Sequence, residues 1–134
     1  MRRSCRDHRD LTPRFPVGPD EAAFFVHELL ARAPAAGAAL LWLDDRRQLL
    51  DLFAVLCDET EAEDVAGKVL EVERSPVAGV VLGSRLPAPL DRPGPDHLAR
   101  WRMLRARFEA AAHVELVDWL VVGDDVIWSL SEVD

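Results

Sequence analysis

The chain contains little cysteine, no tyrosine and no long apolar run in its 134 residues. Its two cysteines, Cys5 and Cys57, have no CxxC neighbour, which argues against a disulfide scaffold, and we expect both to be free thiols. No apolar run approaches the ~18–20 residues that cross a bilayer. The first ten residues, MRRSCRDHRD, lack the apolar core of a secretory signal. We therefore expect a cytoplasmic protein that does not contact membranes.

The composition is that of a globular protein, with 49% hydrophobic and 30% charged residues. A chain of this length fits one domain, because domains usually have ~100–150 residues. The formal net charge is -8 and the pI is about 4.9. An acidic surface repels phosphates, so this charge disfavours nucleic acid as a partner.

The charges divide the chain into two parts. Residues 1–18 contain five arginines and two aspartates, followed by breaks at Pro13, Pro16 and Gly18, and we expect a basic, flexible leader. Residues 19–134 form the expected domain, and without the leader they are more acidic still.

Apolar periodicity and turn residues predict the elements of this domain. Helices are expected at residues 22–32, 61–74 and 97–112, the second begun by a Thr60–Glu63 capping box. Strands are expected at residues 38–43, 48–56, 77–82, 114–122 and 126–130, with a proline-rich loop at 83–96. The predicted order is α-β-β-α-β-loop-α-β-β. This indicates an α/β (α+β) fold with a mixed sheet flanked by helices.

Three segments resemble one known family. They are LLWLDDRRQLL in the first hairpin, SPVAGVVLGS in the third strand and ELVDWLVVGDDVIWSLSE near the C-terminus. Together they resemble the RadC-type JAB/MPN domain, a bacterial branch of the JAMM metalloprotease fold. Trp119 stands where the family has a histidine. The resemblance implies a single JAB/MPN-like domain over residues 19–134.

The resemblance also implies that the family's zinc site is lost. Active members carry H-x-H-P followed by a serine and an aspartate, which supply three ligands and leave one position for a water. Aligned on Pro87, the two histidine positions are Ser84 and Leu86, and the aspartate position is His97, one residue after Asp96. The serine position is Gly94, and the hairpin glutamate that acts as the base falls near Asp51 or Leu52. Leucine has no lone pair for a metal, so we expect no catalytic residue, no metal and no cofactor.

Other interpretations of these residues remain. Asp96 precedes a predicted helix and is a favoured N-cap residue. Asp51, Asp91, Asp96 and His97 could instead provide a rebuilt metal site. We also expect Trp119 to occlude the former active-site cleft if it fills the space of the family histidine.

The sequence therefore gives three hypotheses. The first is an inactive RadC/JAB-like domain that acts as a binding or scaffold module for a protein partner. The second is a metal-dependent, isopeptidase-like hydrolase with relocated ligands. The third is a nucleic-acid accessory protein that binds through the leader and through the arginine-bearing helix predicted at residues 97–112. The expected contact surface comprises Arg85, Pro87, Pro89, Arg92, Arg100 and Arg107.

Overall fold

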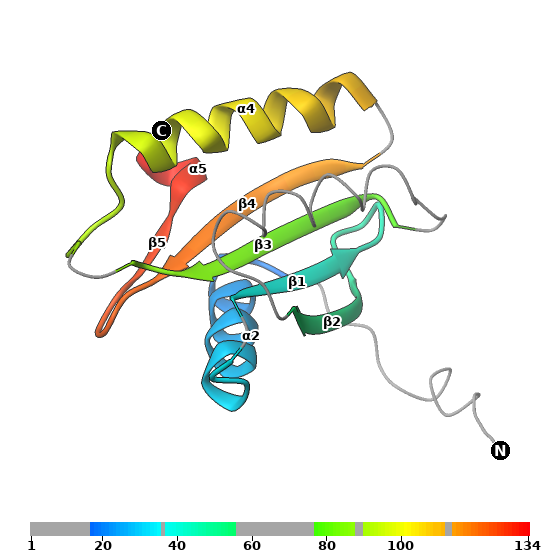
Figure 1. Cartoon of the computed structure of the whole chain (residues 1–134). Helices are drawn as coiled ribbons and strands as arrows, with labels where there is room; N and C mark the ends of the chain where they lie inside the picture. Colours follow the sequence, from blue (N-terminus) through cyan, green and yellow to red (C-terminus); the bar gives the residue numbers. More distant parts are fainter. Residues whose placement is uncertain (1–16, 36, 56–76, 88–89, 112–113) are drawn as a thin grey trace, which may run out of the picture.

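The computed structural model describes residues 17–35, 37–55, 77–87, 90–111 and 114–134 (Figure 1). These residues form a mixed α/β structure with a five-stranded sheet and three helices. In chain order the elements are α2 (Pro19–Arg32), β1 (Ala38–Leu43), β2 (Leu49–Val55), β3 (Gly79–Arg85), α4 (Pro95–Ala111), β4 (Glu115–Val122), β5 (Ile127–Ser129) and α5 (Leu130–Val133).

The strands are arranged in the order β2-β1-β3-β4-β5. β1 pairs antiparallel with both β2 and β3, and β4 pairs antiparallel with β5. The central pair, β3 and β4, is parallel, and α4 connects its two strands. The carboxyl ends of β3 and β4 therefore lie at the same edge of the sheet.

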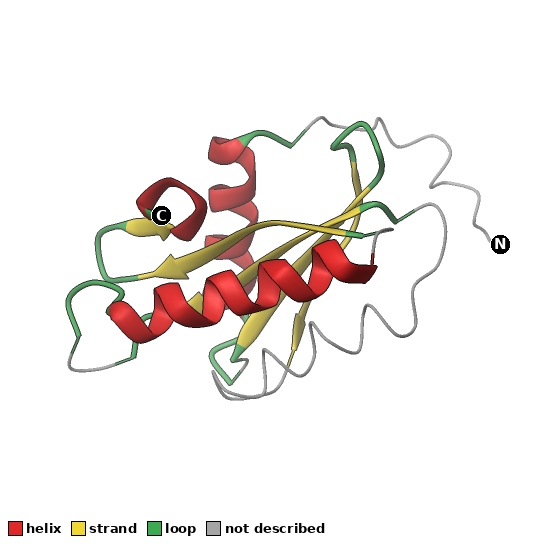
Figure 2. Ribbon diagram, turned by 90° about the horizontal axis from the view of Figure 1, so that it is seen from above, coloured by secondary structure: helices red, strands yellow, loops and turns green. Residues whose placement is uncertain are grey.

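Helices cover both faces of the sheet. α4 and α5 lie on one face, and α2 lies on the other (Figures 1 and 2). Each face has its own apolar core because side chains alternate along a strand. On β1, Leu40 belongs to the core under α4, whereas Ala39 and Leu41 belong to the core against α2.

The start of α2 follows from local chemistry. Pro19 occupies the first turn, where its missing N–H has no intrahelical partner to lose. The side chain of Glu21 accepts a hydrogen bond of 2.9 Å from the backbone N–H of Gly18. Ala22, Val26 and Leu30 are buried on the face that packs against the sheet. Phe24 lies off this face and is 60% exposed.

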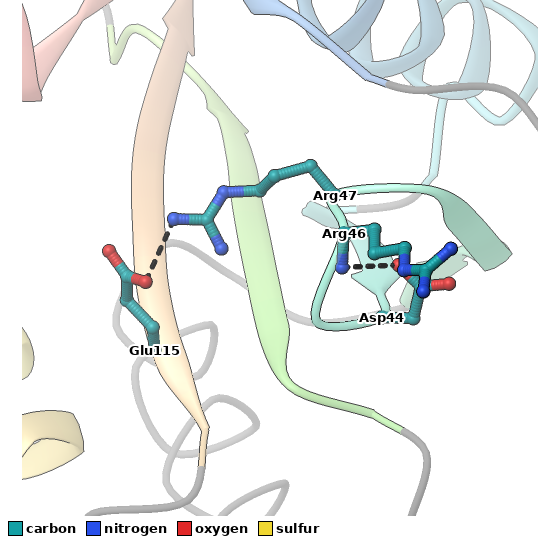
Figure 3. Close-up of polar contacts among 4 residues, drawn as sticks. All are labelled: Asp44, Arg46, Arg47 and Glu115. Carbon is teal, nitrogen blue, oxygen red and sulfur yellow. Dashed lines mark hydrogen bonds and ion pairs between the residues drawn. The ribbon is translucent and has the colours of Figure 1, made fainter.

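The β1–β2 turn fixes one edge of the sheet. Oδ1 of the buried Asp44 accepts hydrogen bonds from the backbone N–H groups of Arg46 (2.8 Å) and Gln48 (3.0 Å). Arg47 has a φ of 64°, in the left-handed region. Its Nη2 lies 2.8 Å from Oε1 of Glu115, the first residue of β4 (Figure 3). The turn is therefore tied to the edge where β4 begins, opposite the edge where β3 and β4 end.

Several predicted boundaries differ from the structure; α2, for example, begins at Pro19 rather than Ala22. β3 continues to Arg85, because Gly83 and Ser84 pair with both β1 and β4 and Arg85 pairs with β4, although their sequence resembles a loop. α4 begins at Pro95 rather than His97, because proline is well suited to the first turn of a helix. Leu130 is not part of the last strand and begins α5.

Some predictions fall outside the described residues. These are the helix at 61–74 with its capping box, residues 1–16 of the leader, Pro89 and both cysteines. The JAB/MPN element order therefore stays a prediction. Within the described part of the chain, no helix has the length and apolarity that crossing a bilayer requires.

Candidate functional site

Ser84, where the resemblance places the first zinc ligand, takes part in a buried hydrogen bond. Ser84 lies on β3 and Trp119 on the neighbouring β4, and both are 0% exposed. Trp119 Nε1 donates to Ser84 Oγ at 2.9 Å. The hydroxyl at the first histidine position is thus used internally and is closed to solvent.

A β-bulge in β4 turns Trp119 toward this position. Val80 pairs with Leu116, but the next residue, Val81, pairs with Asp118, so β4 contains one extra residue. Leu116 and Trp119 therefore share the face under α4, although strict alternation would place them on opposite faces. Oδ1 of Asp118 stabilises the bulge by accepting a hydrogen bond of 2.8 Å from the backbone N–H of Trp119.

Two side chains from α4 cover Trp119. The His97 ring lies 5.9 Å from the Trp119 ring, centroid to centroid, and His97 is 3% exposed. The guanidinium carbon of Arg100 lies 5.6 Å from the same ring, in the range of a cation–π contact. Trp119 thus fills the space among Ser84, His97 and Arg100.

His97 also stabilises the start of α4. Its Nδ1 accepts a hydrogen bond of 3.2 Å from the backbone N–H of Gly94, and its own backbone N–H donates to Gly94 O at 3.1 Å. This reciprocal pair resembles a capping box, with histidine in the place of glutamate. The interpretation of Asp96 as the N-cap is wrong, because the helix has already begun at Pro95.

Asp51, one of the proposed metal ligands, lies far from Ser84. Asp51 is exposed on β2, and its Oδ1 accepts from the N–H of Leu52. Asp51 is paired with Trp42 of β1, which is paired in turn with Val80 of β3, whereas Ser84 of β3 is paired with Ala38. This offset of four residues and two strands separates Asp51 from Ser84 by about 16 Å. Among the residues that the structure describes, no three His, Cys, Asp or Glu side chains could together hold a metal ion.

An open cleft of about 760 Å³ lies beside this filled position, at the carboxyl ends of β3 and β4. We call it the β3–β4 cleft. Ligands of α/β proteins commonly bind at this edge of parallel strands. Leu86, at the second histidine position, lies in the cleft, and its N–H extends the β3–β4 ladder by donating to Val122 O at 2.8 Å. The lining residues are His27, Leu30, Ala31, Arg85, Leu86, Leu90, Asp91, Val122, Gly123, Asp124, Asp125 and Val126.

The predicted contact residues within the described structure line two pockets or are exposed. Arg85 lies in the cleft, and its Nη2 donates to the backbone carbonyls of Leu30 (2.6 Å) and Ala33 (3.2 Å). Pro87 and Arg100 line a smaller pocket of about 330 Å³, together with Asp96 and His97. Arg92 and Arg107 are exposed.

The arginines of α4 interact with neighbouring groups of the chain. Nη2 of Arg102 lies 2.5 Å from Oδ1 of Asp134, and this hydrogen bond lowers the pKa of Asp134 below its ordinary value. The guanidinium carbon of Arg105 lies 5.9 Å from the Trp101 ring. The ion pair with Asp134 offsets the positive charge that Arg102 presents to phosphates.

The cleft walls that come from α2 and from the β4–β5 turn are not among the residues that the sequence singles out. The local pattern at Asp124 and Asp125, an acidic pair after Gly123 and between two apolar segments, indicates only a turn. Their place at the site follows from the parallel pairing of β3 and β4, which brings the end of β4 beside Leu86. A predicted β-α-β unit was the signal that could have located them.

No protein-family model matches the chain, and no curated protein matches it.

Proposed function

We propose that this chain is a catalytically inactive domain of the RadC-like JAB/MPN type that acts as a binding or scaffold module for a protein partner. The observation that carries the proposal is the hydrogen bond between Trp119 Nε1 and Ser84 Oγ, in a position with no solvent exposure. The resemblance assigns a zinc ligand to Ser84, and the indole occupies the space that the ion would need. The proposal includes a cytoplasmic location.

The binding role is supported by the β3–β4 cleft. A volume of about 760 Å³ is in the range of protein ligand sites, which is ~300–1,000 Å³. Its walls are held in place by the Arg85 hydrogen bonds to α2 and by the backbone pairing of Leu86 with Val122. A preformed surface loses less conformational entropy on binding.

Metal content provides the first test. The chain is purified without chelators, desalted, and analysed for zinc by elemental mass spectrometry. We expect much less than one zinc per chain, and no hydrolysis of an isopeptide-linked substrate after zinc is added. One tightly held zinc per chain, or zinc-dependent hydrolysis, would contradict the proposal.

The same zinc measurement tests the alternative hypothesis, a metal-dependent hydrolase with relocated ligands. If the relocated ligands act, Asp96→Ala and His97→Ala abolish zinc binding, whereas the matched control Asp45→Ala, an exposed aspartate in the β1–β2 turn, does not. Equal zinc content in all variants dismisses relocated ligands.

Rebuilding the family motif tests the resemblance itself. Ser84→His, Leu86→His and His97→Asp restore the ligand types, and Trp119→His removes the indole from their centre. The combined variant is expected to take up zinc and to gain thermal stability from it, because a metal that binds only the folded state stabilises it. A variant with native-like circular dichroism and no affinity for zinc would refute the assigned positions.

A further inference from the structure

The β3–β4 cleft combines apolar and acidic side chains. Leu90 and Val126 line it and are 47% and 46% exposed, which makes them two of the five exposed large apolar residues in the described structure. Asp91, Asp124 and Asp125 are exposed around them. Exposed apolar side chains beside charged ones are typical of a protein-binding surface.

The three carboxylates do not converge on one point. No group of three potential ligands in the described part of the chain is arranged to hold a metal ion, and this includes the three aspartates. They come from two separate segments, the stretch before α4 and the β4–β5 turn. Negative charges spread along a cleft suit a ligand whose positive charges are also spread along its length.

The basic residues of the cleft are oriented toward other groups. Nη2 of Arg85 donates to carbonyl oxygens at the end of α2, where a cation also interacts favourably with the helix dipole. Nδ1 of His27 lies 3.8 Å from Oε2 of Glu28. Nε of Arg92 lies 3.9 Å from Oδ1 of Asp91, and both side chains are exposed. Asp124 and Asp125 therefore give the open part of the cleft most of its negative character, in a chain whose net charge is already -8.

We propose that the β3–β4 cleft binds an extended polypeptide segment of the partner, in which arginine or lysine stands beside an apolar residue. The basic side chains would pair with Asp91, Asp124 and Asp125, and the apolar side chain would pack on Leu90 and Val126. This inference rests on the proposed function and names the chemical class of the partner. The acidic side chains at the cleft disfavour nucleic acid as the occupant.

The experiment selects peptides on the immobilised full chain from a phage-displayed library of random 12-mers. The enriched sequences are then synthesised, and their affinities are measured by fluorescence anisotropy. The test variant carries Asp124→Asn and Asp125→Asn. The control carries Asp45→Asn and Glu109→Gln, which change the net charge equally at exposed positions outside the cleft.

We expect the enriched peptides to contain arginine or lysine within two positions of leucine, isoleucine or phenylalanine. Their affinity should fall about fivefold to tenfold in the cleft variant and by less than twofold in the control, since each exposed ion pair contributes modestly. Leu90→Ser should weaken the same peptides. Enrichment of acidic peptides, equal affinity for both charge variants, or no enrichment at all would overturn the inference.

A competition experiment tests whether the chain's own residues 1–16 bind the cleft, because these residues contain arginines, Leu11 and Phe15. A synthetic peptide of this sequence that competes fully with the selected peptides would assign the cleft to the chain itself and overturn a separate partner. A different result would refute the proposed function: zinc-dependent hydrolysis would contradict it whatever peptides are selected. A chain without zinc and without selected peptides would refute only the inference about the cleft.

Discussion

Gly83 lies at a close contact between β3 and α2. A Cβ at this position would lie 2.4 Å from Val26 Cγ1 and 3.0 Å from Val26 Cγ2. Both residues are fully buried, so neither contact can be relieved into solvent. We therefore predict that Gly83→Ala destabilises the fold by a steric conflict with one identified side chain.

The expected magnitude combines two opposing effects. Overpacking in a core costs typically 1–3 kcal/mol, whereas replacing a strand glycine with alanine gains roughly 0.5–1 kcal/mol. The cost of overpacking should exceed the gain from replacing glycine, and Gly83→Ala should reduce the free energy of unfolding by about 1–2 kcal/mol. Val26→Ala removes two buried methyl groups and leaves a cavity, for a loss of about 2–3 kcal/mol.

The double variant is expected to be more stable than the sum of the single effects predicts. Removal of the Val26 methyl groups relieves the closest contacts and leaves only Val26 Cβ, at 3.3 Å, which a shift of a few tenths of an ångström accommodates. The methyl group introduced by Gly83→Ala also fills part of the cavity. A favourable coupling energy of about 1–2 kcal/mol follows.

Urea unfolding monitored by tryptophan fluorescence measures this cycle, because Trp101 and Trp119 are buried in the native state. Gly94→Ala provides the control, since no atom lies within 4 Å of a Cβ built at Gly94. Its effect should add to that of Val26→Ala within ~0.5 kcal/mol. The contact would be refuted if Gly83→Ala were neutral, or if its effect and that of Val26→Ala were simply additive.

Two further predictions concern polar contacts. Ser84→Ala should reduce the free energy of unfolding by about 1–3 kcal/mol, because it leaves the buried Trp119 Nε1–H without its acceptor; in a Trp119→Phe background this loss should shrink, and an unchanged loss in urea unfolding would contradict it. The Asp134 carboxyl should titrate by NMR below the ordinary value of about 3.9 and move upward in Arg102→Gln. Since the pKa of Asp134 is lower in the folded state, its stabilising contribution is present above about pH 4 and is lost as the pH falls through the folded pKa. A normal pKa for Asp134 would refute the Arg102 contact.

The local sequence predicts those elements whose signals are local. The acidic first turn and Pro19 indicate α2, and the apolar run at residues 38–43 coincides with β1. Trp101, Leu104 and Phe108 recur at helical spacing in α4, and all three are buried. In each case the local pattern of apolar residues and the residues at the boundaries suffice to predict the element.

The end of β3 could not be predicted in this way. The residues Gly83, Ser84 and Arg85 have weak strand propensity and precede several prolines. They are extended because β1 and β4 pair with Gly83 and Ser84 on both sides and β4 continues the pairing to Arg85. The tight approach of Val26 then makes the lack of a side chain at Gly83 an advantage.

The sequence by itself determined which chemical groups are present: a hydroxyl and a hydrocarbon at Ser84 and Leu86, where the resembled family has imidazoles. Only the tertiary structure decided what fills the space between them. The bulge in β4 depends on its pairing with β3, and it places Trp119 on the face of Ser84. Likewise, Asp124 lies beside Leu86 because two parallel strands end at one edge, and no local pattern encodes that neighbourhood.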